Sequence, residues 1–334
     1  MQSVKTVKTA PSLRAVPGYV AVISAPRRIE VRRIEFPAPA AGEVRLKVEG
    51  CGVCASNLEL WQGKPWFKYP VEPGAPGHEA WGRIDAIGDD VTDLAVGDRV
   101  AMLSSHAFAE YDFAKCSEVV RLPATLDREP VPAEPLGCAV NIFKRANIRR
   151  GETVAIVGTG FLGTLVTQLA ANAGARVLAL SHRRSSLKLA RGFGAEATIE
   201  IHDKQQALNN VNELTGGRGC ECVIEAAGKQ ESLDLASELT SERGRLVIAG
   251  YHQDGPRQVN MQLWNWRGLD VINAHERDPQ VYVAGMREAI AAVESGALNP
   301  RPLYTHTFKL AELPQAFGAI ERSPEGFVKA LITL

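Results

Sequence analysis

The chain has 334 residues, 45% of them hydrophobic, and its 38 basic and 38 acidic side chains give a formal net charge of +0. Because neither sign forms a long block, this balance argues against nucleic acid and charged membrane surfaces as partners and favours small molecules. The length exceeds what one hydrophobic core usually organises, which predicts two domains.

Six cysteines are spread along a chain that shows no secretory hydrophobic segment, which predicts a cytoplasmic location with free or metal-bound thiols. The longest apolar runs are far shorter than a membrane span. Residues 1–29 carry basic but no acidic side chains, a bias that faintly resembles a transit peptide. A short tail, residues 1–18, that leads into a strand is the better interpretation.

In chain order, residues 19–103 predict short strands between Gly/Pro turns, a pattern typical of a β-barrel-like region. Beyond Pro132 the pattern changes to strands that alternate with helices, which predicts a doubly wound parallel sheet. The expected early strands are 20–22, 44–48, 82–87 and 99–102. The expected later elements are helix 136–146, strand 152–157, helix 163–173, strand 176–180, helices 185–191 and 205–215, strand 222–225, helix 231–239 and strand 245–249. After residue 273 we expect helix 281–294, strand 304–308, helix 311–321 and strand 328–332, which return to the first domain.

A glycine pattern, Gly158-Thr159-Gly160-Phe161-Leu162-Gly163, follows an apolar β-run and precedes an apolar helix. In this context the pattern predicts a dinucleotide-binding turn. Gly158 and Gly160 allow a tight turn and close approach to a pyrophosphate, Gly163 lets helix and strand pack, and the helix N-terminus adds positive potential. Phe161 and Leu162 complete the expected cofactor contacts.

No acidic residue occurs between Gly163 and Glu196, although an NAD-selective site places one about twenty residues after the turn. The second strand instead ends in Ser181, His182, Arg183 and Arg184. A small hydroxyl at Ser181 leaves room for a 2′-phosphate, and a guanidinium from Arg183 or Arg184 grips it with two hydrogen bonds. The hypothesis is therefore NADP(H), with NAD(H) as the alternative if both arginines lie on a solvated helix start.

Two segments carry side chains suited to zinc. Cys54 follows Gly52-Val53, and His78 lies in Gly77-His78-Glu79, so a thiolate and an imidazole come from different parts of the chain. Further on, Glu134 and Cys138 lie four residues apart, and on a helix both face the same way.

These motifs, in this order and with the turn 97–100 between them, resemble the zinc-dependent medium-chain alcohol and polyol dehydrogenases from Tyr19 onward. The resemblance implies an α/β fold: a GroES-like, β-barrel-type catalytic domain with an inserted Rossmann domain built on a doubly wound parallel sheet, and zinc in the cleft between them. The expected boundaries are 19–138 with 274–334 for the catalytic domain and 139–273 for the Rossmann domain.

The resemblance also implies that Cys54 and His78 bind zinc. Family members use either a carboxylate at the position of Glu134 or a cysteine at that of Cys138. We favour Cys138 because thiolate is the softer ligand, with Glu79 or Glu134 as an exchangeable fourth ligand or water contact. Cys116 is the one cysteine in the stretch 97–122, so we do not expect the four-cysteine structural zinc lobe of many relatives. We expect one catalytic zinc ion.

In the implied mechanism zinc polarises the substrate oxygen while hydride moves to or from the nicotinamide, and Ser56 relays the proton. Two positions depart from the family pattern. Asn57 replaces an aspartate that acts on a zinc ligand, and Glu59 replaces a relay histidine. Glu59 either passes the proton outward or is a solvated side chain.

Three aromatic side chains, Trp61, Trp66 and Phe108, match positions where relatives build the substrate pocket. The alternative for the stretch 60–67 is an aromatic loop staple.

Near the nicotinamide, relatives place residues that match Gly250, Tyr251, Asn273 and His275. His275 is either a substrate or proton-relay group or an interface residue. Lys329 matches a basic position that clamps the pyrophosphate, or it is a strand-edge lysine.

The expected function is hydride transfer between NADP(H) and a secondary alcohol, cyclitol or polyol, or the corresponding ketone or aldehyde. A zinc-free quinone or enoyl reductase of the same superfamily is the alternative, although the zinc motifs count against it. A catalytically silent NADPH-binding protein is another, because of Asn57 and Glu59. The resemblance further suggests a homodimer or homotetramer joined edge to edge through the Rossmann sheets.

Overall fold

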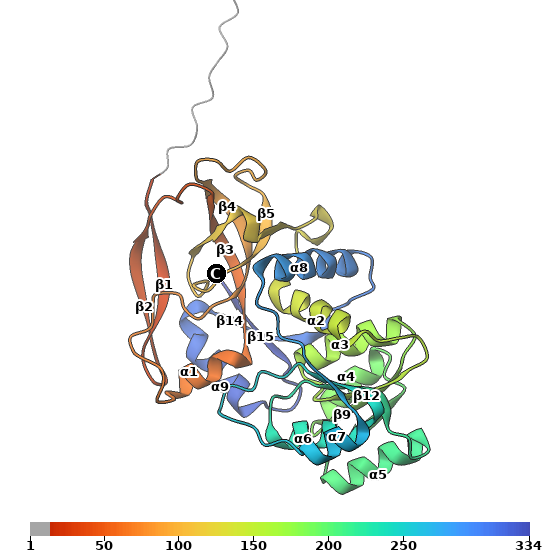
Figure 1. Cartoon of the computed structure of the whole chain (residues 1–334). Coiled ribbons are helices and arrows are strands. Elements are labelled where there is room, and N and C mark those ends of the chain that lie inside the picture. Colours follow the sequence, from red (N-terminus) through yellow and green to blue (C-terminus); the bar gives the residue numbers. More distant parts are fainter. Residues whose placement is uncertain (1–13) are drawn as a thin grey trace, which may run out of the picture.

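The computed structural model describes residues 14–334 and divides them between two domains, each built on a large sheet of its own (Figure 1). Of the predicted tail, residues 1–13 lie outside the described part, and strand β1 (Val16–Ala25) begins within its last residues. No helix between residues 14 and 334 is long and apolar enough to cross a membrane.

The first domain is a curved, largely antiparallel β structure. Its seven-stranded sheet has the order β14-β15-β3-β4-β5-β7, with β6 paired to β3, and a β1–β2 hairpin packs beside it. The last strand, β15, pairs antiparallel with β3, so the C-terminal segment does return to the first domain as predicted. The strands besides β1 are β2 (Arg28–Phe36), β3 (Glu43–Val53), β4 (Glu79–Ile87), β5 (Arg99–Leu103), β6 (Tyr111–Lys115), β7 (Val119–Arg121), β14 (Tyr304–Lys309) and β15 (Lys329–Thr333). The helices are α1 (Leu58–Gln62) and α9 (Leu313–Arg322).

The second domain is a six-stranded parallel sheet of order β10-β9-β8-β11-β12-β13. Its central strands read as continuous apolar runs because helices cover both faces, as a doubly wound sheet requires. The strands are β8 (Thr153–Val157), β9 (Arg176–Ser181), β10 (Ala197–Glu200), β11 (Cys220–Glu225), β12 (Thr240–Ile248) and β13 (Asp270–Asn273). The helices are α3 (Phe161–Asn172), α4 (Arg184–Gly192), α5 (Lys204–Thr215), α6 (Gln230–Leu239) and α7 (Met261–Arg267). The predicted fold class is confirmed.

Helices α2 (Ala133–Ala146) and α8 (Pro279–Glu294) lie side by side between the two sheets (Figure 1). Helix α2 runs without a break through the predicted domain boundary at 138/139. The two helices approach closely because each presents a glycine: a Cβ on Gly137 would lie 2.8 Å from the backbone nitrogen of Met286, and one on Gly285 would lie 2.5 Å from Asn141 Oδ1. This contact fixes the first turns of α2, which face the cleft.

Candidate active site

A cleft of about 1390 Å³ lies between the domains. The first domain and α2 contribute Cys54, His78 and Cys138 to its lining, and the Rossmann domain contributes the glycine turn and the ends of β9, β11 and β12. In a parallel sheet this carboxyl edge is where dinucleotides bind. Metal-ligand chemistry and the predicted dinucleotide turn therefore share one cavity.

Cys54, His78 and Glu79 form a compact cluster whose potential ligand atoms all lie within 4.8 Å of one another. Cys54 comes directly after β3, and His78 directly precedes β4, which pairs antiparallel with β3. Strand pairing thus brings together ligands that are twenty-four residues apart in sequence. Glu79, the first residue of β4, completes the set.

The imidazole of His78 is oriented by backbone rather than by a carboxylate. Its Nδ1 lies 2.9 Å from the carbonyl oxygen of Pro76, and Asn57 Nδ2 donates to the same oxygen at 3.3 Å. This arrangement makes Nδ1 the protonated nitrogen and leaves Nε2 free to bind a metal. Asn57 therefore acts on the carbonyl that holds His78.

The proton balance between Cys54 and His78 is strongly perturbed. Burial opposes charge on both groups, but their mutual hydrogen bond and attraction outweigh it: the pKa of Cys54 is lowered, and that of His78 is raised to about 10. In such a part-buried pair of a thiolate and an imidazolium, a cation readily replaces the shared proton.

The buried carboxylate of Glu79 is a second feature typical of a cation site. Its side chain is fully buried, and its Oε2 has no hydrogen-bond partner among residues 14–334. The close approach depends on Gly52, where a Cβ would lie 1.7 Å from that oxygen. An unpaired buried carboxylate oxygen beside a thiolate and an imidazole fits a zinc ion.

The other two predicted metal residues approach from α2. Cys138 Sγ donates to Glu134 Oε1 at 3.2 Å, so the two side chains do face the same way. Burial raises the pKa of both groups, and for Glu134 the nearby charge of His78 offsets part of the rise. Neither belongs to the compact set of Cys54, His78 and Glu79, and either can supply a further ligand from α2.

Lys329 lies between the cluster of Cys54, His78 and Glu79 and the glycine turn. Its Nζ is 2.5 Å from Glu79 Oε1 and 5.0 Å from the centre of the Phe161 ring, and the residue is buried. Lys329 lines the cleft, with its ammonium group paired with Glu79, and its contact with the pyrophosphate stays a prediction. The alternative of a strand-edge lysine is therefore wrong.

Ser56 and Glu59 both line the cleft. Ser56 Oγ donates to Asn57 Oδ1 at 3.3 Å. Glu59 is only 6% exposed, and its Oε2 has no hydrogen-bond partner within residues 14–334, so it is not the solvated side chain of the alternative interpretation. An unpaired buried carboxylate in the cleft is suited to accept a proton.

The glycine turn has the geometry that a dinucleotide needs. Gly158 has a φ of 99°, which disfavours any other residue, and Gly160 is the N-cap of α3. A Cβ on Gly163 would lie 2.0 Å from the carbonyl oxygen of Gly158. Gly163 is therefore a packing residue, whereas Gly158, Gly160, Phe161 and Leu162 line the cleft.

The structure separates the two predicted arginines. Arg183 lines the cleft next to Ser181, and its Nη1 donates to the carbonyl oxygen of Phe327 at 2.8 Å. Arg184 lies outside the lining and pairs with Glu200 at 2.8 Å, which corrects its prediction as a cofactor residue. Sequence reasoning missed three basic residues that also line this end: His182, His202 and Lys204.

Gly250, Tyr251 and His275 line the cleft, which is compatible with their predicted roles, whereas Asn273 does not. Its Oδ1 accepts from the backbone nitrogen of His275 at 3.1 Å, so Asn273 acts through that residue. The His275 ring lies 3.1 Å from the carbonyl oxygen of Gly250 through Nε2. Among the residues missed from sequence is Tyr282, which also lines the cleft; burial raises its pKa.

The aromatic residues predicted for the substrate wall lie elsewhere. Trp61 is 4% exposed and stacks on Phe317, with ring centres 5.1 Å apart, and Phe108 packs edge-on against the same ring at 6.2 Å. Trp66 is exposed. None of the three belongs to the cleft lining formed by residues 14–334, so the structure corrects the prediction for all of them. The core of the first domain takes up Trp61 and Phe108.

Comparisons with known proteins agree with this architecture. A family model described as "Alcohol dehydrogenase GroES-like domain" matches residues 40–128, and one described as "Zinc-binding dehydrogenase" matches residues 162–292. A sorbitol dehydrogenase from Halalkalibacterium halodurans is 28% identical over 330 residues, which are 89% of this chain and 93% of the relative. An erythritol/L-threitol dehydrogenase from Mycolicibacterium smegmatis is 28% identical over 354 residues, covering 93% and 96%.

Among solved structures, a zinc-binding dehydrogenase from Sinorhizobium meliloti 1021 bound to NADP aligns with a TM-score of 0.83 and 26% identity, covering 96% of this chain and 100% of that one. The fold and the cluster beside the dinucleotide turn define an oxidoreductase of the medium-chain type. The chain belongs to the zinc-type medium-chain dehydrogenase family and is an NAD(P)-dependent oxidoreductase of the alcohol dehydrogenase type.

Proposed function

We propose that this enzyme is a zinc-dependent, NADP(H)-preferring dehydrogenase of a secondary alcohol, cyclitol or polyol. The observation that carries the proposal is the Cys54, His78 and Glu79 cluster in the same cleft as the glycine turn. A zinc-free reductase has no use for such a cluster. A silent binding protein has no use for the buried, unpaired carboxylate of Glu59 beside it.

Cys54 and His78, with Glu79 and either Cys138 or Glu134, would hold one catalytic zinc ion, which when bound polarises the substrate oxygen. Ser56 would take the hydroxyl proton and Glu59 would carry it onward, since both line the cleft.

A polyhydroxylated substrate suits the polar side chains of the first-domain end of the cleft. Glu59, Gln62, Lys64 and Asn141 offer donors and acceptors there, and the predicted aromatic wall is absent from the described lining. The two relatives named for sorbitol and for erythritol/L-threitol support the same substrate class.

The test is a screen of NADP+ reduction over secondary alcohols, cyclitols and polyols, with zinc content measured in the same preparations. We expect activity that follows zinc content and a Cys54→Ala variant that loses both. Full activity of a zinc-free preparation would end the zinc proposal. Tight NADPH binding without turnover on any of these substrates or their ketones would favour the silent binding protein.

Two further predictions accompany the function. Strand β13 is an edge of the parallel sheet, so a second copy can extend the sheet in a homodimer, or in a homotetramer of such pairs. Light scattering at several concentrations tests this, and a monomer throughout contradicts it.

All six cysteines are free thiols, which is compatible with the predicted cytoplasmic location.

A further inference from the structure

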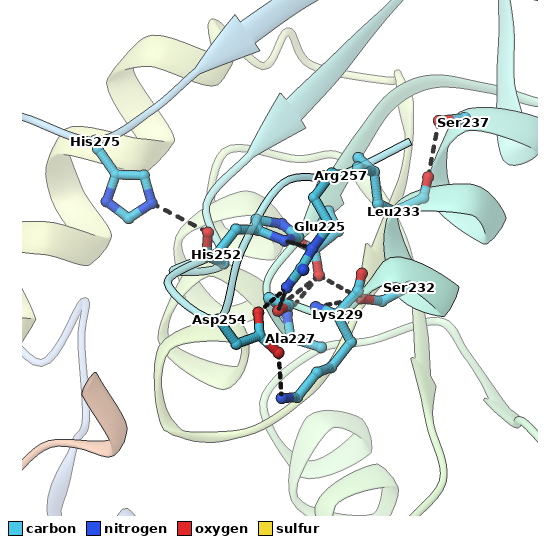
Figure 2. A network of polar contacts seen from close by, with 12 residues as sticks. Glu225, Ala227, Lys229, Ser232, Leu233, Ser237, His252, Asp254, Arg257 and His275 are labelled. Carbon is cyan, nitrogen blue, oxygen red and sulfur yellow. Dashed lines mark hydrogen bonds and ion pairs between the residues drawn. The ribbon is translucent and has the colours of Figure 1, made fainter. Parts of the chain in front are cut away.

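A buried carboxylate that the mechanism does not use lies at the end of β11. Glu225 has no exposed surface (0%). Its Oε1 accepts hydrogen bonds from the backbone nitrogens of Ala227 at 2.8 Å and Gly228 at 2.7 Å, and from Ser232 Oγ at 2.6 Å (Figure 2). One oxygen therefore holds the whole turn that follows β11.

The second oxygen of Glu225 holds the loop that follows β12. His252 Nε2 lies 2.9 Å from Oε2, and Arg257 Nε donates to His252 Nδ1 at 2.8 Å (Figure 2). Because a guanidinium can only donate, Nδ1 of His252 is the acceptor. Nε2 therefore carries the ring proton and donates a hydrogen bond to Glu225. Arg257 thus fixes the tautomer that lets His252 bind Glu225.

Arg257 also closes the network from the other side. Its Nη2 donates to the carbonyl oxygen of Gly228 at 3.0 Å and to Asp254, whose other oxygen is 3.5 Å from Lys229 Nζ. The loops 226–229 and 250–258 are therefore tied to one carboxylate and to each other.

The two loops pack without spare room. A Cβ on Gly250 would lie 2.3 Å from the nitrogen of Gly228 and 2.5 Å from Glu225 Oε2. Both loops line the cleft, at the carboxyl ends of adjacent parallel strands: the lining residues are Ala226, Ala227, Gly228, Lys229, Gly250, Tyr251, Gln253 and Asp254.

We propose that Glu225, His252 and Arg257 form a latch that positions these two loops for the dinucleotide. The three are positioning residues, since none of them belongs to the described cleft lining and they act through the loop backbones. A latched loop is ordered before the cofactor arrives, so binding bears a smaller entropic cost. The proposal rests on the proposed binding of a nicotinamide dinucleotide in this cleft.

The experiment compares His252→Phe, which removes both hydrogen bonds, with His252→Gln, which keeps one donor and one acceptor. The control is Glu152→Gln, which breaks the part-buried pair with Arg245 elsewhere in the same sheet, outside the cleft lining. We expect His252→Phe to raise the Kd for NADPH and the KM for NADP+ about tenfold with little change in kcat. Both other variants should stay within about twofold of wild type. Amide exchange in loops 226–229 and 250–258 should quicken in His252→Phe alone.

An unchanged Kd in His252→Phe, with faster exchange in both loops, overturns the latch, because the loops would then be free of any role in binding. An equal loss of affinity in Glu152→Gln also overturns it, because general destabilisation would explain the effect. If His252→Phe does not fold, Arg257→Met gives the same comparison. A wild-type enzyme that binds neither NADPH nor NADH is a separate outcome, in which the proposed function itself fails and the latch with it.

Discussion

Glu79 and Lys329 form a buried ion pair with 2.5 Å between Oε1 and Nζ. Removing one partner of such a pair leaves the other charge uncompensated. We expect Lys329→Met to lower the free energy of unfolding by ~3–5 kcal/mol. Urea unfolding measures this change.

The matched control is Lys144→Met, since Lys144 also lies 2.5 Å from a carboxylate, that of Glu288, but both side chains are about half exposed. An exposed pair contributes ~0–1 kcal/mol. Equal losses in the two variants would show that burial of the Lys329 pair has no energetic consequence.

Asp112 predicts a pH dependence of stability. Burial raises its pKa to about 6, although the backbone nitrogen of Phe113 donates to it at 2.8 Å. Because the folded pKa lies above the unfolded one, the protonated group stabilises the fold at low pH, and this contribution is lost as pH rises through about 6. From pH 4.5 to pH 7.5, the free energy of unfolding of Asp112→Asn should therefore rise by about 2 kcal/mol relative to that of the wild type. A difference independent of pH would contradict the shift.

At the scale of elements, the sequence predicted best where periodicity is strong. In the doubly wound domain, strands β8, β9 and β11 and helices α3 to α6 were expected within a few residues of their observed bounds, because their hydrophobic patterns are pronounced. The short strands β10 and β13, of four residues each, were not expected. Strand β2 was missed because it carries five charged residues in nine, with Phe36 its one buried residue. Helix α7 was missed because it has no buried residue, so no apolar stripe marks it.

The contact between α2 and α8 yields a prediction for Gly137. A Cβ there would lie 2.8 Å from a backbone atom, which cannot move aside as a side chain can. Gly137→Ala should lower the free energy of unfolding by ~1–3 kcal/mol. It should also reduce zinc content, because the turn that carries Glu134 and Cys138 must shift. Calorimetry and metal analysis measure the two effects.

Gly192→Ala is the matched control, because Gly192 also lies in a helix but a Cβ there meets nothing within 4 Å. It should be neutral or slightly stabilising, since alanine is the better helix former. If both variants behave alike, close packing of α2 on α8 is not what holds the turn that carries Glu134 and Cys138.

At the scale of the whole molecule, sequence motifs identified the candidate site, but they did not predict which side chains face the cleft and which are buried in the core. Cys54, His78 and Gly158 carry local signatures and were predicted. The burial of Trp61 against Phe317 was not, because 256 residues separate the two rings. Glu225 was read only as the end of a strand, since its partners belong to loops whose course depends on tertiary packing.

The predicted cofactor preference depends on both domains. Arg183, in the Rossmann domain, donates a hydrogen bond to the carbonyl oxygen of Phe327, which leads back into the first domain. A ligand that binds only the folded state stabilises that state by ~2.7 kcal/mol when its concentration is about a hundred times its Kd. We expect NADP+ to raise the melting temperature of the wild type more than NAD+ does at equal concentration.

Arg183→Ala should remove that advantage of NADP+, whereas Arg184→Ala should keep it, because Arg184 pairs with Glu200 outside the cleft lining. The ratio of kcat/KM for the two cofactors should change in parallel. A preference for NAD(H) that Arg183→Ala leaves undiminished contradicts the 2′-phosphate site, and equal effects of the two variants would trace the preference to general positive charge at this end of the cleft.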